Sequence, residues 1–585
     1  MTRNQFLLIF ISIILMSCSS LTDRPDKSLK KVSAPSGDFF GIENEENYIF
    51  KGIPYAQAPV GDLRWKAPRE YTPTKSIYAT DFGNECVQPG DDYVLGVYRR
   101  SNTIGEEDCL YLNIFIPKKG EVLESNSFPV MFWIHGGANI YGSANTYDFQ
   151  NLIKKDVIVV SINYRLGPFG WFSSDFIRDD ASGLDLTSNF AHLDMIQALK
   201  WVKQNISKFG GDPNNITIFG ESAGGHNILA LLASPLSKGL FQKAISQSGY
   251  SSTYSLEEAT SLSTLSSEKV FEEDIKFMTK SSEIVEYLKE LSHQEIYARY
   301  EEASDREVYP ILPVTVRDGI VIPKKGILRS LEQVDPNVTV LAGTNRDEMN
   351  FYYIRSDYFY DTTLEIRRNL KRSEENLKSW IRYRSDIWRH LGAEEPLRRM
   401  SKNNANLYSF RFDWDEQSNS IAGNYALYLG AAHAMEIPFM LGDFEMQEIP
   451  FYLRSIVFPN SSLSGAKALS EDMMTYWSNV AKYGNPNSFG NTDWEKFTEN
   501  NQSFLVLDNP LENQIGMVND PVVPEEFLKE LESDTTLELK ERCLISWIAV
   551  EYFSEFTNPS PPFSFCRDYS DDELHILRNL VEGRD

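Results

Sequence analysis

The chain has 585 residues, of which 42% are hydrophobic and 24% charged, with 34 Gly and 27 Pro. This composition is that of a globular protein, and it excludes a collagen, a low-complexity disordered chain and a disulfide-dense miniprotein. Acidic residues outnumber basic ones 83 to 57, giving a net charge of -26, which argues against a nucleic-acid partner because phosphate binding depends on clustered Lys and Arg.

The N-terminus has the pattern of an export signal. Its apolar run, from Phe6 to Met16, is too short for a helix to cross a bilayer of about 30 Å. The sequence Leu15-Met16-Ser17-Cys18 resembles a bacterial lipobox, which predicts a signal peptide over residues 1–17, lipidation of Cys18 and a tether over residues 18–35. The alternative is ordinary signal-peptide cleavage nearby, with Cys18 uninvolved. We therefore expect an exported protein, lipid-anchored to a bacterial outer membrane or otherwise secreted.

Short apolar and β-branched runs alternate with helical patterns along the middle of the chain. The candidate buried strands are residues 129–134, 157–162, 216–219 and 338–342. Apolar residues at helical spacing lie between the second and third of them, from Leu193 to Ile206. Such alternation predicts an α/β fold with a central, mostly parallel sheet. Residues 255–306 and 364–399 are charged and helix-prone, and we expect helical insertions there rather than separate domains.

Residues 216–225 have the pattern of a strand, then G-x-S-x-G, then the start of a helix. A serine lifted off a sheet on so sharp a turn adopts a strained backbone, and side chains two residues before and after it would collide. Gly220 and Gly224 remove that collision, so Ser222 is the candidate nucleophile. The G-x-S-x-G pattern alone arises by chance in many chains. The strand before it and the helix after it make it a specific indication of a nucleophilic serine.

A serine hydroxyl is a weak nucleophile until a base takes its proton, so a histidine and a carboxylate are expected later in the chain. His433 lies in a small-residue stretch that suits a tight loop. The other histidines precede the serine, follow it on the same helix or lie in charged segments expected to be solvent-exposed: His135, His192, His226, His293, His390 and His575. The carboxylate would follow residues 338–342, where Asp347 and Glu348 are both candidates and periodicity does not separate them.

Backbone N–H donors for an oxyanion are the third requirement. The glycine-rich residues 135–138 follow the candidate strand 129–134, where a flexible loop can present N–H groups. The Ala223 amide at the start of the next helix is another donor, favoured by the helix dipole. The alternative for residues 135–138 is a plain glycine-rich turn.

Together these features resemble the type-B carboxylesterase/cholinesterase family of α/β hydrolases, in a bacterial lipoprotein-like member, over about residues 39–552. Further motifs that carry the resemblance are residues 51–56, 59–65, 107–113, 163–170, 209–213, 247–249, 343–348 and 477–487. The resemblance implies an α/β-hydrolase domain over residues 36–555, with helical insertions over the active site, and a C-terminal tail over residues 556–585.

The resemblance also implies roles for individual residues. Ser222 would be the nucleophile, His433 the base and Glu348, rather than Asp347, the acid. The implied oxyanion donors are the amides of Gly137, Ala138 and Ala223. No metal and no organic cofactor is implied, and the expected partner is a small-molecule ester.

Two further side chains have open interpretations. Ser248 matches a buried serine that supports the triad in relatives, and its alternative role is packing. Glu221 precedes the nucleophile and biases the local electric field, or else makes structural hydrogen bonds.

Four cysteines remain apart from Cys18, an even number that suits an oxidising compartment. Sequence allows three pairings, and the shortest loops favour Cys86 with Cys109 and Cys543 with Cys566. By resemblance the first pair flanks the active-site gorge. Cys543 matches a cysteine whose usual distant partner is missing here, so Cys566 would replace it.

The chain departs from the family pattern at residues 188–195 and at His226-Asn227, where relatives usually have a small residue and a serine. Residues 250–254 also differ, so choline specificity is unsupported. The expected function is hydrolysis of small to medium carboxylic esters through an acyl-enzyme. The alternatives are a non-catalytic cholinesterase-like binding protein, or a hydrolase of amides, lactones or lipids that uses the same triad.

Overall fold

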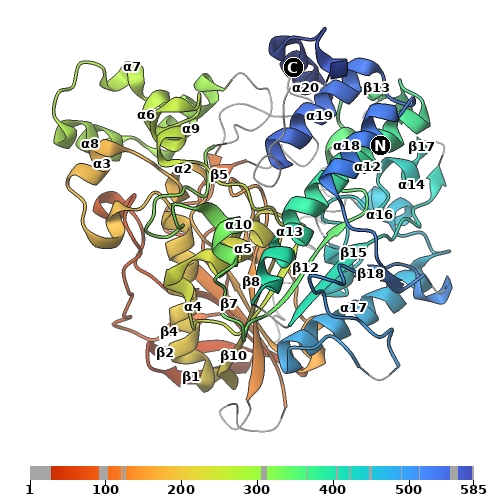
Figure 1. Cartoon of the computed structure of the whole chain (residues 1–585). Coiled ribbons are helices and arrows are strands. Elements are labelled where there is room, and N and C mark those ends of the chain that lie inside the picture. The colour runs from red at the N-terminus through yellow and green to blue at the C-terminus, as the bar shows by residue number, and fades with distance from the viewer. Residues whose placement is uncertain are drawn as a thin grey trace, which may run out of the picture.

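The computed structural model describes residues 28–90, 103–119, 123, 127–304, 312–364, 367–403, 406–420, 423–446, 451–488, 490–512, 514–553 and 564–582. The expected signal peptide and Cys18 lie outside these residues. A 13-stranded sheet runs through the centre of the molecule (Figure 1). Its strands, in spatial order, are β1 (Ser28–Ala34), β2 (Gly37–Glu43), β3 (Asn47–Pro54), β7 (Tyr111–Pro117), β9 (Ile158–Ile162), β8 (Phe128–Ile134), β10 (Gly211–Glu221), β11 (Lys243–Gln247), β12 (Thr339–Asn345), β15 (Leu407–Phe412), β18 (Phe504–Leu507) and β19 (Gly516–Val518), with β4 (Ile77–Ala79) beside β2.

The centre of the sheet is parallel and its edges are antiparallel. Every neighbouring pair from β9 to β18 is parallel. The pairs along β1, β2, β3, β7 and β9 are antiparallel, as is the last pair, β18 with β19, whereas the short strand β4 pairs with β2 in parallel. Each parallel step needs a crossover, and these crossovers bring helices to both faces of the sheet. The predicted α/β fold and the four candidate strands are confirmed.

The central strands are apolar throughout because each of their faces packs on a different core. In β8, Val130, Phe132 and Ile134 belong to one hydrophobic cluster, and Met131 and Trp133 belong to the other. Successive side chains of a strand point to opposite faces, so a strand buried on both sides reads as one continuous apolar run. This explains why no alternation of polar and apolar residues was visible there.

Helices cover the two faces separately. The first cluster includes side chains of α4 (Phe190–Asn205), α5 (Ala223–Ala233), α10 (Gly326–Leu331) and α13 (Glu395–Ser401). The second includes those of α15 (Ile437–Leu441) and α17 (Leu463–Tyr483). Shorter elements connect these layers: α2 (Gly167–Gly170), α3 (Asp175–Asp179), α11 (Asn350–Tyr353), α14 (Tyr425–Tyr428), α16 (Phe451–Val457), β5 (Gln88–Pro89), β6 (Thr103–Ile104), β13 (Tyr360–Leu364), β14 (Arg367–Leu370), β16 (Asn419–Ser420) and β17 (Gly423–Asn424).

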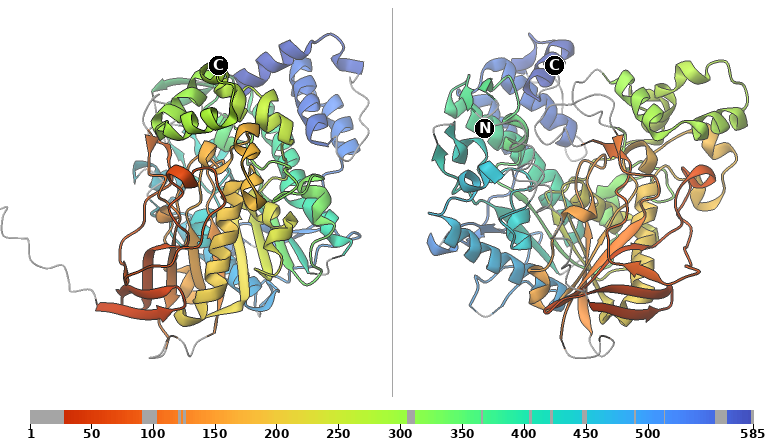
Figure 2. Two further views of the ribbon diagram at one scale, coloured as in Figure 1. Left: turned by 90° about the vertical axis from the view of Figure 1, so that its left-hand side faces the viewer. Right: turned by 180° about the vertical axis from the view of Figure 1, so that it is seen from behind.

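Both predicted helical insertions are present. The first contains α6 (Ser267–Val270), α7 (Glu272–Ile275), α8 (Ser281–Glu290) and α9 (His293–Ala303). The second contains α12 (Glu374–Arg389), which packs in a third hydrophobic cluster with α18 (Pro524–Ser533), α19 (Leu539–Phe553) and α20 (Asp571–Val581). The two groups lie at the same end of the sheet, on either side of it (Figure 1), and the C-terminal helices stand clear of the strands in side view (Figure 2).

The two expected domain ends need correction. The residues predicted as a tether reach only to 27 at most, because β1 pairs with β2 from Ser28 onward. The region predicted as a C-terminal tail contains α20, whose Leu574, Leu577 and Val581 are buried in the third cluster. Both ends of the described chain are therefore part of the fold.

The described chain contains two disulfides. Cys86 bonds to Cys109, and Cys543 on α19 bonds to Cys566. The pairing expected from the shortest loops is thus the one present. None of the helices in the described ranges is both long enough and apolar enough to cross a membrane.

Candidate active site

Ser222 occupies a sharp turn between β10 and α5. Its backbone has φ 57° and ψ -122°, a conformation that residues other than glycine rarely adopt. A Cβ at Gly220 would lie 2.6 Å from the carbonyl oxygen of Ile134, and a Cβ at Gly224 would lie 2.0 Å from the same oxygen. Both positions therefore require glycine, as the G-x-S-x-G pattern predicts.

Three side chains from separate segments meet at this turn. His433 Nε2 lies 2.8 Å from Ser222 Oγ, and His433 Nδ1 lies 2.6 Å from Glu348 Oε2. The other carboxylate oxygen of Glu348 accepts a hydrogen bond of 2.9 Å from the backbone N–H of Asn345, which holds the carboxylate in place. A hydroxyl, an imidazole and a carboxylate in series can transfer the hydroxyl proton to the imidazole and stabilise the resulting cation.

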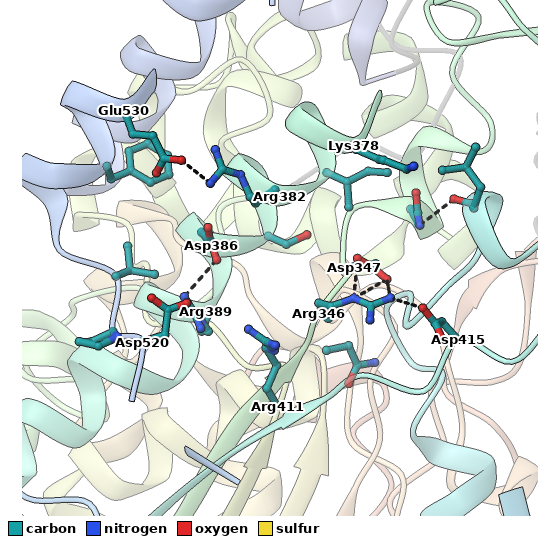
Figure 3. A pocket seen from close by; sticks show the side chains of 18 of the residues that line it. Arg346, Asp347, Lys378, Arg382, Asp386, Arg389, Arg411, Asp415, Asp520 and Glu530 are labelled. Atoms are coloured by element: carbon teal, nitrogen blue, oxygen red, sulfur yellow. Dashed lines mark hydrogen bonds and ion pairs between the residues drawn. The ribbon is translucent and has the colours of Figure 1, made fainter. Parts of the chain in front are cut away.

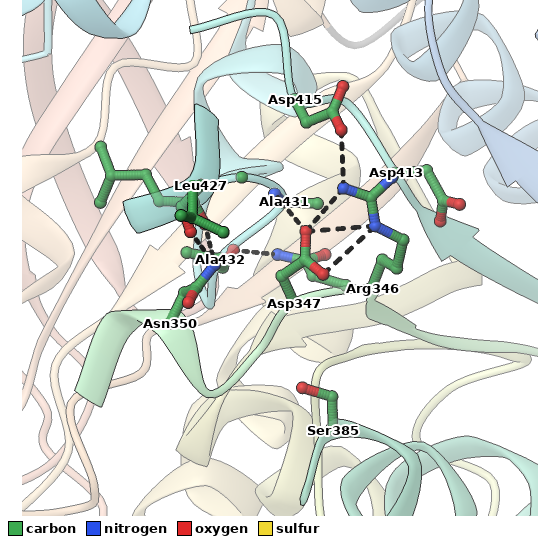
Figure 4. Close-up of polar contacts among 12 residues, drawn as sticks. Arg346, Asp347, Asn350, Ser385, Asp413, Asp415, Leu427, Ala431 and Ala432 are labelled. Carbon is green, nitrogen blue, oxygen red and sulfur yellow. Dashed lines mark hydrogen bonds and ion pairs between the residues drawn. The ribbon is translucent and has the colours of Figure 1, made fainter. Parts of the chain in front are cut away.

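Asp347, the other carboxylate candidate, has different partners (Figure 4). Its Oδ2 lies 2.7 Å from Arg346 Nη2 and accepts a hydrogen bond of 3.1 Å from the backbone N–H of Ala431. Arg346 also donates to Asp415 at 2.8 Å. Asp347 therefore joins the loop after β12 to the loop that carries His433, while the imidazole contact belongs to the neighbouring glutamate.

The loop after β8 passes directly beside the nucleophile. A Cβ at Gly136 would lie 3.0 Å from the Cβ of Ser222. Gly137 and Ala138 follow with φ 96° and 53°. Ala223 is the first residue of α5, so its N–H is among those that the helix leaves without an intrahelical acceptor. The predicted oxyanion donors thus lie on the two elements that adjoin Ser222.

Two more buried glutamates lie near His433. Glu221 Oε1 is 3.3 Å from His433 Nε2, and Glu436 accepts a hydrogen bond of 2.7 Å from Asn345 Nδ2. Burial by itself would lower the pKa of His433, but Glu221 and Glu348 outweigh it and raise this pKa to about 9. Burial raises the pKa of Glu221 well above its usual range. Glu436 was given no role from the sequence. Its position three residues after His433 was the available sign that its carboxylate lies near the imidazole.

Ser248 is fully buried and lies in the left-handed region, with φ 49°. Its Oγ makes no hydrogen bond within the described ranges, so the hydroxyl is not bonded to a triad residue. Its carbonyl oxygen accepts from Trp388 Nε1 at 3.1 Å.

Aromatic rings surround the imidazole. The ring centroid of Trp388 is 4.7 Å from that of His433, and those of Phe351 and Tyr352 are 5.8 and 6.0 Å away. None of the three was predicted from the sequence: Trp388 lies on α12, which was treated only as part of a helical insertion, and Phe351 and Tyr352 lie on the short helix α11 that follows Glu348. The available signs of these aromatic contacts were two aromatic residues within a few positions of Glu348 and a tryptophan on a charged helix.

The other histidines lie outside this arrangement, as expected, but one environment was predicted wrongly. His226 is buried on α5, and its ring nitrogens lie 2.6 Å from the carbonyl oxygen of Tyr250 and 2.6 Å from Thr315 Oγ1. His390, expected to be solvent-exposed, is fully buried, with its ring packed edge-on against Phe553. Burial lowers the pKa of His390 to about 3. His390 directly follows α12 and shares the third hydrophobic cluster's side of the chain with Phe553 of α19, so the charged residues that precede it in sequence do not indicate its exposure.

A charged pocket of about 700 Å³ opens beside Asp347, at the carboxyl ends of β12 and β15 (Figure 3). The residues that line it include neither the Ser222 hydroxyl nor its two partners in the relay. Cations and carboxylates on its walls pair with one another: Arg389 lies 3.1 Å from Asp386, and Arg382 lies 2.6 Å from Glu530. The pocket is therefore separate from the triad, although Asp347 borders both.

Comparison with known proteins finds relatives that span most of this chain. Residues 28–374 and 354–521 match the model of the carboxylesterase family. A para-nitrobenzyl esterase of Bacillus subtilis (strain 168) is 33% identical over 511 residues, which cover 84% of this chain and 96% of that protein. A medium-chain fatty acyl-CoA hydrolase precursor of Anas platyrhynchos is 31% identical over 509 residues, covering 79% of this chain and 84% of that protein.

Solved structures give the same result. A PNB esterase superposes with a TM-score of 0.67 at 30% identity and covers 85% of this chain and 99% of its own. A carboxylesterase of Geobacillus stearothermophilus superposes with a TM-score of 0.66 at 26% identity, covering 84% of this chain and 98% of its own.

Proposed function

The chain belongs to the carboxylesterase family and is a serine hydrolase of carboxylic esters, and we propose that Ser222, His433 and Glu348 form its catalytic triad. The observation that carries this proposal is the unbroken relay of two contacts, 2.8 Å from hydroxyl to imidazole and 2.6 Å from imidazole to carboxylate. These distances are those of hydrogen bonds that can pass a proton without a conformational change.

The reaction begins when Ser222 Oγ attacks the ester carbonyl carbon and its proton moves to His433 Nε2. Glu348 accepts from Nδ1–H, which keeps Nε2 free as the base and stabilises the imidazolium that forms. His433 then returns the proton to the departing alcohol, which leaves an acyl-serine. A water molecule, deprotonated by the same imidazole, attacks this acyl group, releases the acid and restores the hydroxyl.

The negative charge of each tetrahedral intermediate needs donors that are in place before the reaction. We assign this role to the amides of Gly137, Ala138 and Ala223, which lie on the loop and the helix beside Ser222. Removal of one such donor typically costs about 10²–10³ in rate. Glu221 acts on the pKa of the imidazole, and Ser248 contributes packing under the site.

We propose small to medium esters with an apolar acyl or alcohol group as substrates. The rings of Trp388, Tyr352 and Phe351 lie within 4.7 to 6.0 Å of the imidazole ring, centroid to centroid. An apolar wall beside the reacting atoms favours an apolar substituent there, because it removes that group from water. A relative with similar sequence is named for a para-nitrobenzyl substrate, which has this character.

The test is a series of p-nitrophenyl esters of increasing acyl length, with Ser222→Ala beside the wild-type enzyme. We expect turnover with short and medium chains and a loss of at least about 10⁴-fold in kcat for Ser222→Ala. Ser207→Ala, at an exposed serine away from the site, is the matched control and should keep full activity. Turnover that survives Ser222→Ala would remove the assigned nucleophile.

We further propose that the protein is exported and anchored by a lipid on Cys18, with residues 19–27 as the tether. The support is the lipobox-like sequence and the two disulfides, which persist in oxidising compartments. Mass spectrometry of the mature N-terminal peptide should find a diacylated Cys18, and Cys18→Ser should release the enzyme from the membrane fraction. A mature N-terminus with an unmodified Cys18 would refute the anchor.

A further inference from the structure

The loop that presents Gly137 and Ala138 has an unfavourable backbone. Three consecutive residues have positive φ: 96° at Gly137, 53° at Ala138 and 62° at Asn139. Glycine adopts such angles freely and asparagine tolerates them, but a Cβ makes them costly for alanine. Such a conformation persists only where surrounding contacts hold it. The contacts that hold this loop therefore determine where its amides point.

Asn139 links this loop to two other parts of the chain. Its carbonyl oxygen accepts a hydrogen bond of 2.8 Å from the backbone N–H of Gly167. Its side-chain Oδ1 accepts one of 2.8 Å from Asn227 Nδ2 and lies 3.4 Å from the hydroxyl of Tyr164, which donates to the carbonyl oxygen of His135 at 2.7 Å. Asn139, Asn227 and Tyr164 are fully buried, so water does not compete for these bonds.

Asn227 links the two halves of the oxyanion site. It lies on α5, the helix that starts at Ala223, four residues after that amide donor. Its partner Asn139 directly follows Ala138 on the loop. One side-chain hydrogen bond therefore connects α5, which carries the proposed Ala223 donor, to the loop that carries the other two proposed donors.

We propose that Asn227 is a positioning residue for oxyanion stabilisation: its Nδ2–H to Asn139 Oδ1 bond sets the distance and angle between the loop amides and the α5 amide. Asn227 does not touch substrate, and it acts through Asn139. The proposal rests on the esterase mechanism above and adds a residue to it. Position 227 is one of the departures from the family pattern, and the asparagine there places its amide 2.8 Å from Asn139 Oδ1 on the loop.

The expected signature is a loss in kcat without a loss in substrate binding. The donors must fit the oxyanion of the transition state rather than the ground-state carbonyl, so their misplacement weakens only the transition state. For Asn227→Ala we expect kcat to fall by about 5- to 20-fold, with KM changed by less than about twofold. The affinity for a trifluoromethyl ketone, which forms a tetrahedral adduct with the serine, should fall in the same ratio as kcat.

A double-mutant cycle separates positioning from a general structural effect. Asn139→Gly keeps the positive φ accessible and removes the acceptor, so it should show the same kcat loss. In the Asn139→Gly background, Asn227→Ala should cost less than about twofold more, because the bond is already gone. Asn376→Ala, which removes a buried amide among the C-terminal helices, is the matched control and should lower thermal stability without lowering kcat.

The kinetic results of these variants either support or overturn the positioning role of Asn227. Full kcat in both single variants, or independent losses that multiply in the double variant, would overturn the proposal. A kcat loss with no loss of ketone affinity would also overturn it. If Asn227→Ala does not fold, Asn139→Gly alone still tests the same bond. Titration with a fluorophosphonate probe counts reactive Ser222, so absence of labelling in the wild-type enzyme would point to failure of the proposed triad and not of this inference.

Discussion

Replacement of Glu221 by glutamine should move the acidic limb of the pH–activity profile to lower pH. Glu221 Oε1 lies 3.3 Å from His433 Nε2, the atom that must be free of a proton for the serine to be activated. A negative charge at that distance favours the imidazolium. Removing it lowers the pKa of His433 from about 9, so the neutral base is present at lower pH.

The size of the shift follows from Coulomb's law. Two unit charges 3.3 Å apart interact by about 1 kcal/mol at a dielectric constant of 80 and by about 5 kcal/mol at 20. One pKa unit corresponds to about 1.4 kcal/mol, which gives a shift of about one to four units. Burial raises the pKa of Glu221 well above its usual range, which reduces the average negative charge on this carboxylate. We therefore expect the lower end, about one unit.

The assay is kcat/KM against pH, from about pH 5 to pH 10, for one p-nitrophenyl ester, because this ratio reports the base in the free enzyme. Glu499→Gln makes the same change in net charge at an exposed position away from the site and should leave the profile in place. An acidic limb that does not move in Glu221→Gln, or that moves to higher pH, would contradict the reasoning.

Three further changes test the site and the fold. Glu348→Gln should lower kcat by about 10²–10⁴-fold because the imidazole loses the carboxylate that orients it. Asp347→Asn should lower kcat by less than about tenfold, because Asp347 has no contact with the imidazole. The ratio of the two kcat values shows which carboxylate supports the base. Gly224→Ala should lower the midpoint of thermal unfolding by several degrees or prevent folding, because its Cβ would lie 2.0 Å from a backbone oxygen. Replacing both Cys543 and Cys566 by serine should reduce the free energy of unfolding, measured with denaturant, by about 3 kcal/mol, and an unchanged midpoint would mean that this disulfide does not constrain the unfolded chain.

Local features of the fold were readable from the sequence because their causes are local. The central strands are buried on both faces, so they read as continuous apolar runs such as residues 129–134. The nucleophile turn was readable because it needs glycine at two fixed positions around Ser222. The helical insertions were readable because their charged, amphipathic pattern repeats over many residues.

The ends of the fold were predicted less well, for different reasons. β1 is an edge strand in which Val32 is the buried residue and most other side chains are exposed, so its polar composition resembles a linker. In α20 the buried positions Leu574, Leu577 and Val581 do have helical spacing, so periodicity was sufficient to find this helix. His390 was misjudged because a charged neighbourhood in sequence does not say which side of the helix faces a partner.

The sequence by itself determined that a strand, a strained serine turn and a following helix exist, because each depends on residues within a few positions of one another. Only the folded chain shows which imidazole and which carboxylate lie beside that serine. His433 lies 211 residues after Ser222, and only the order of parallel strands brings the two together. Asp347 and Glu348 have the same chemistry and adjacent positions, yet beyond the end of β12 they face different neighbours, one the backbone of the histidine loop and the other the imidazole.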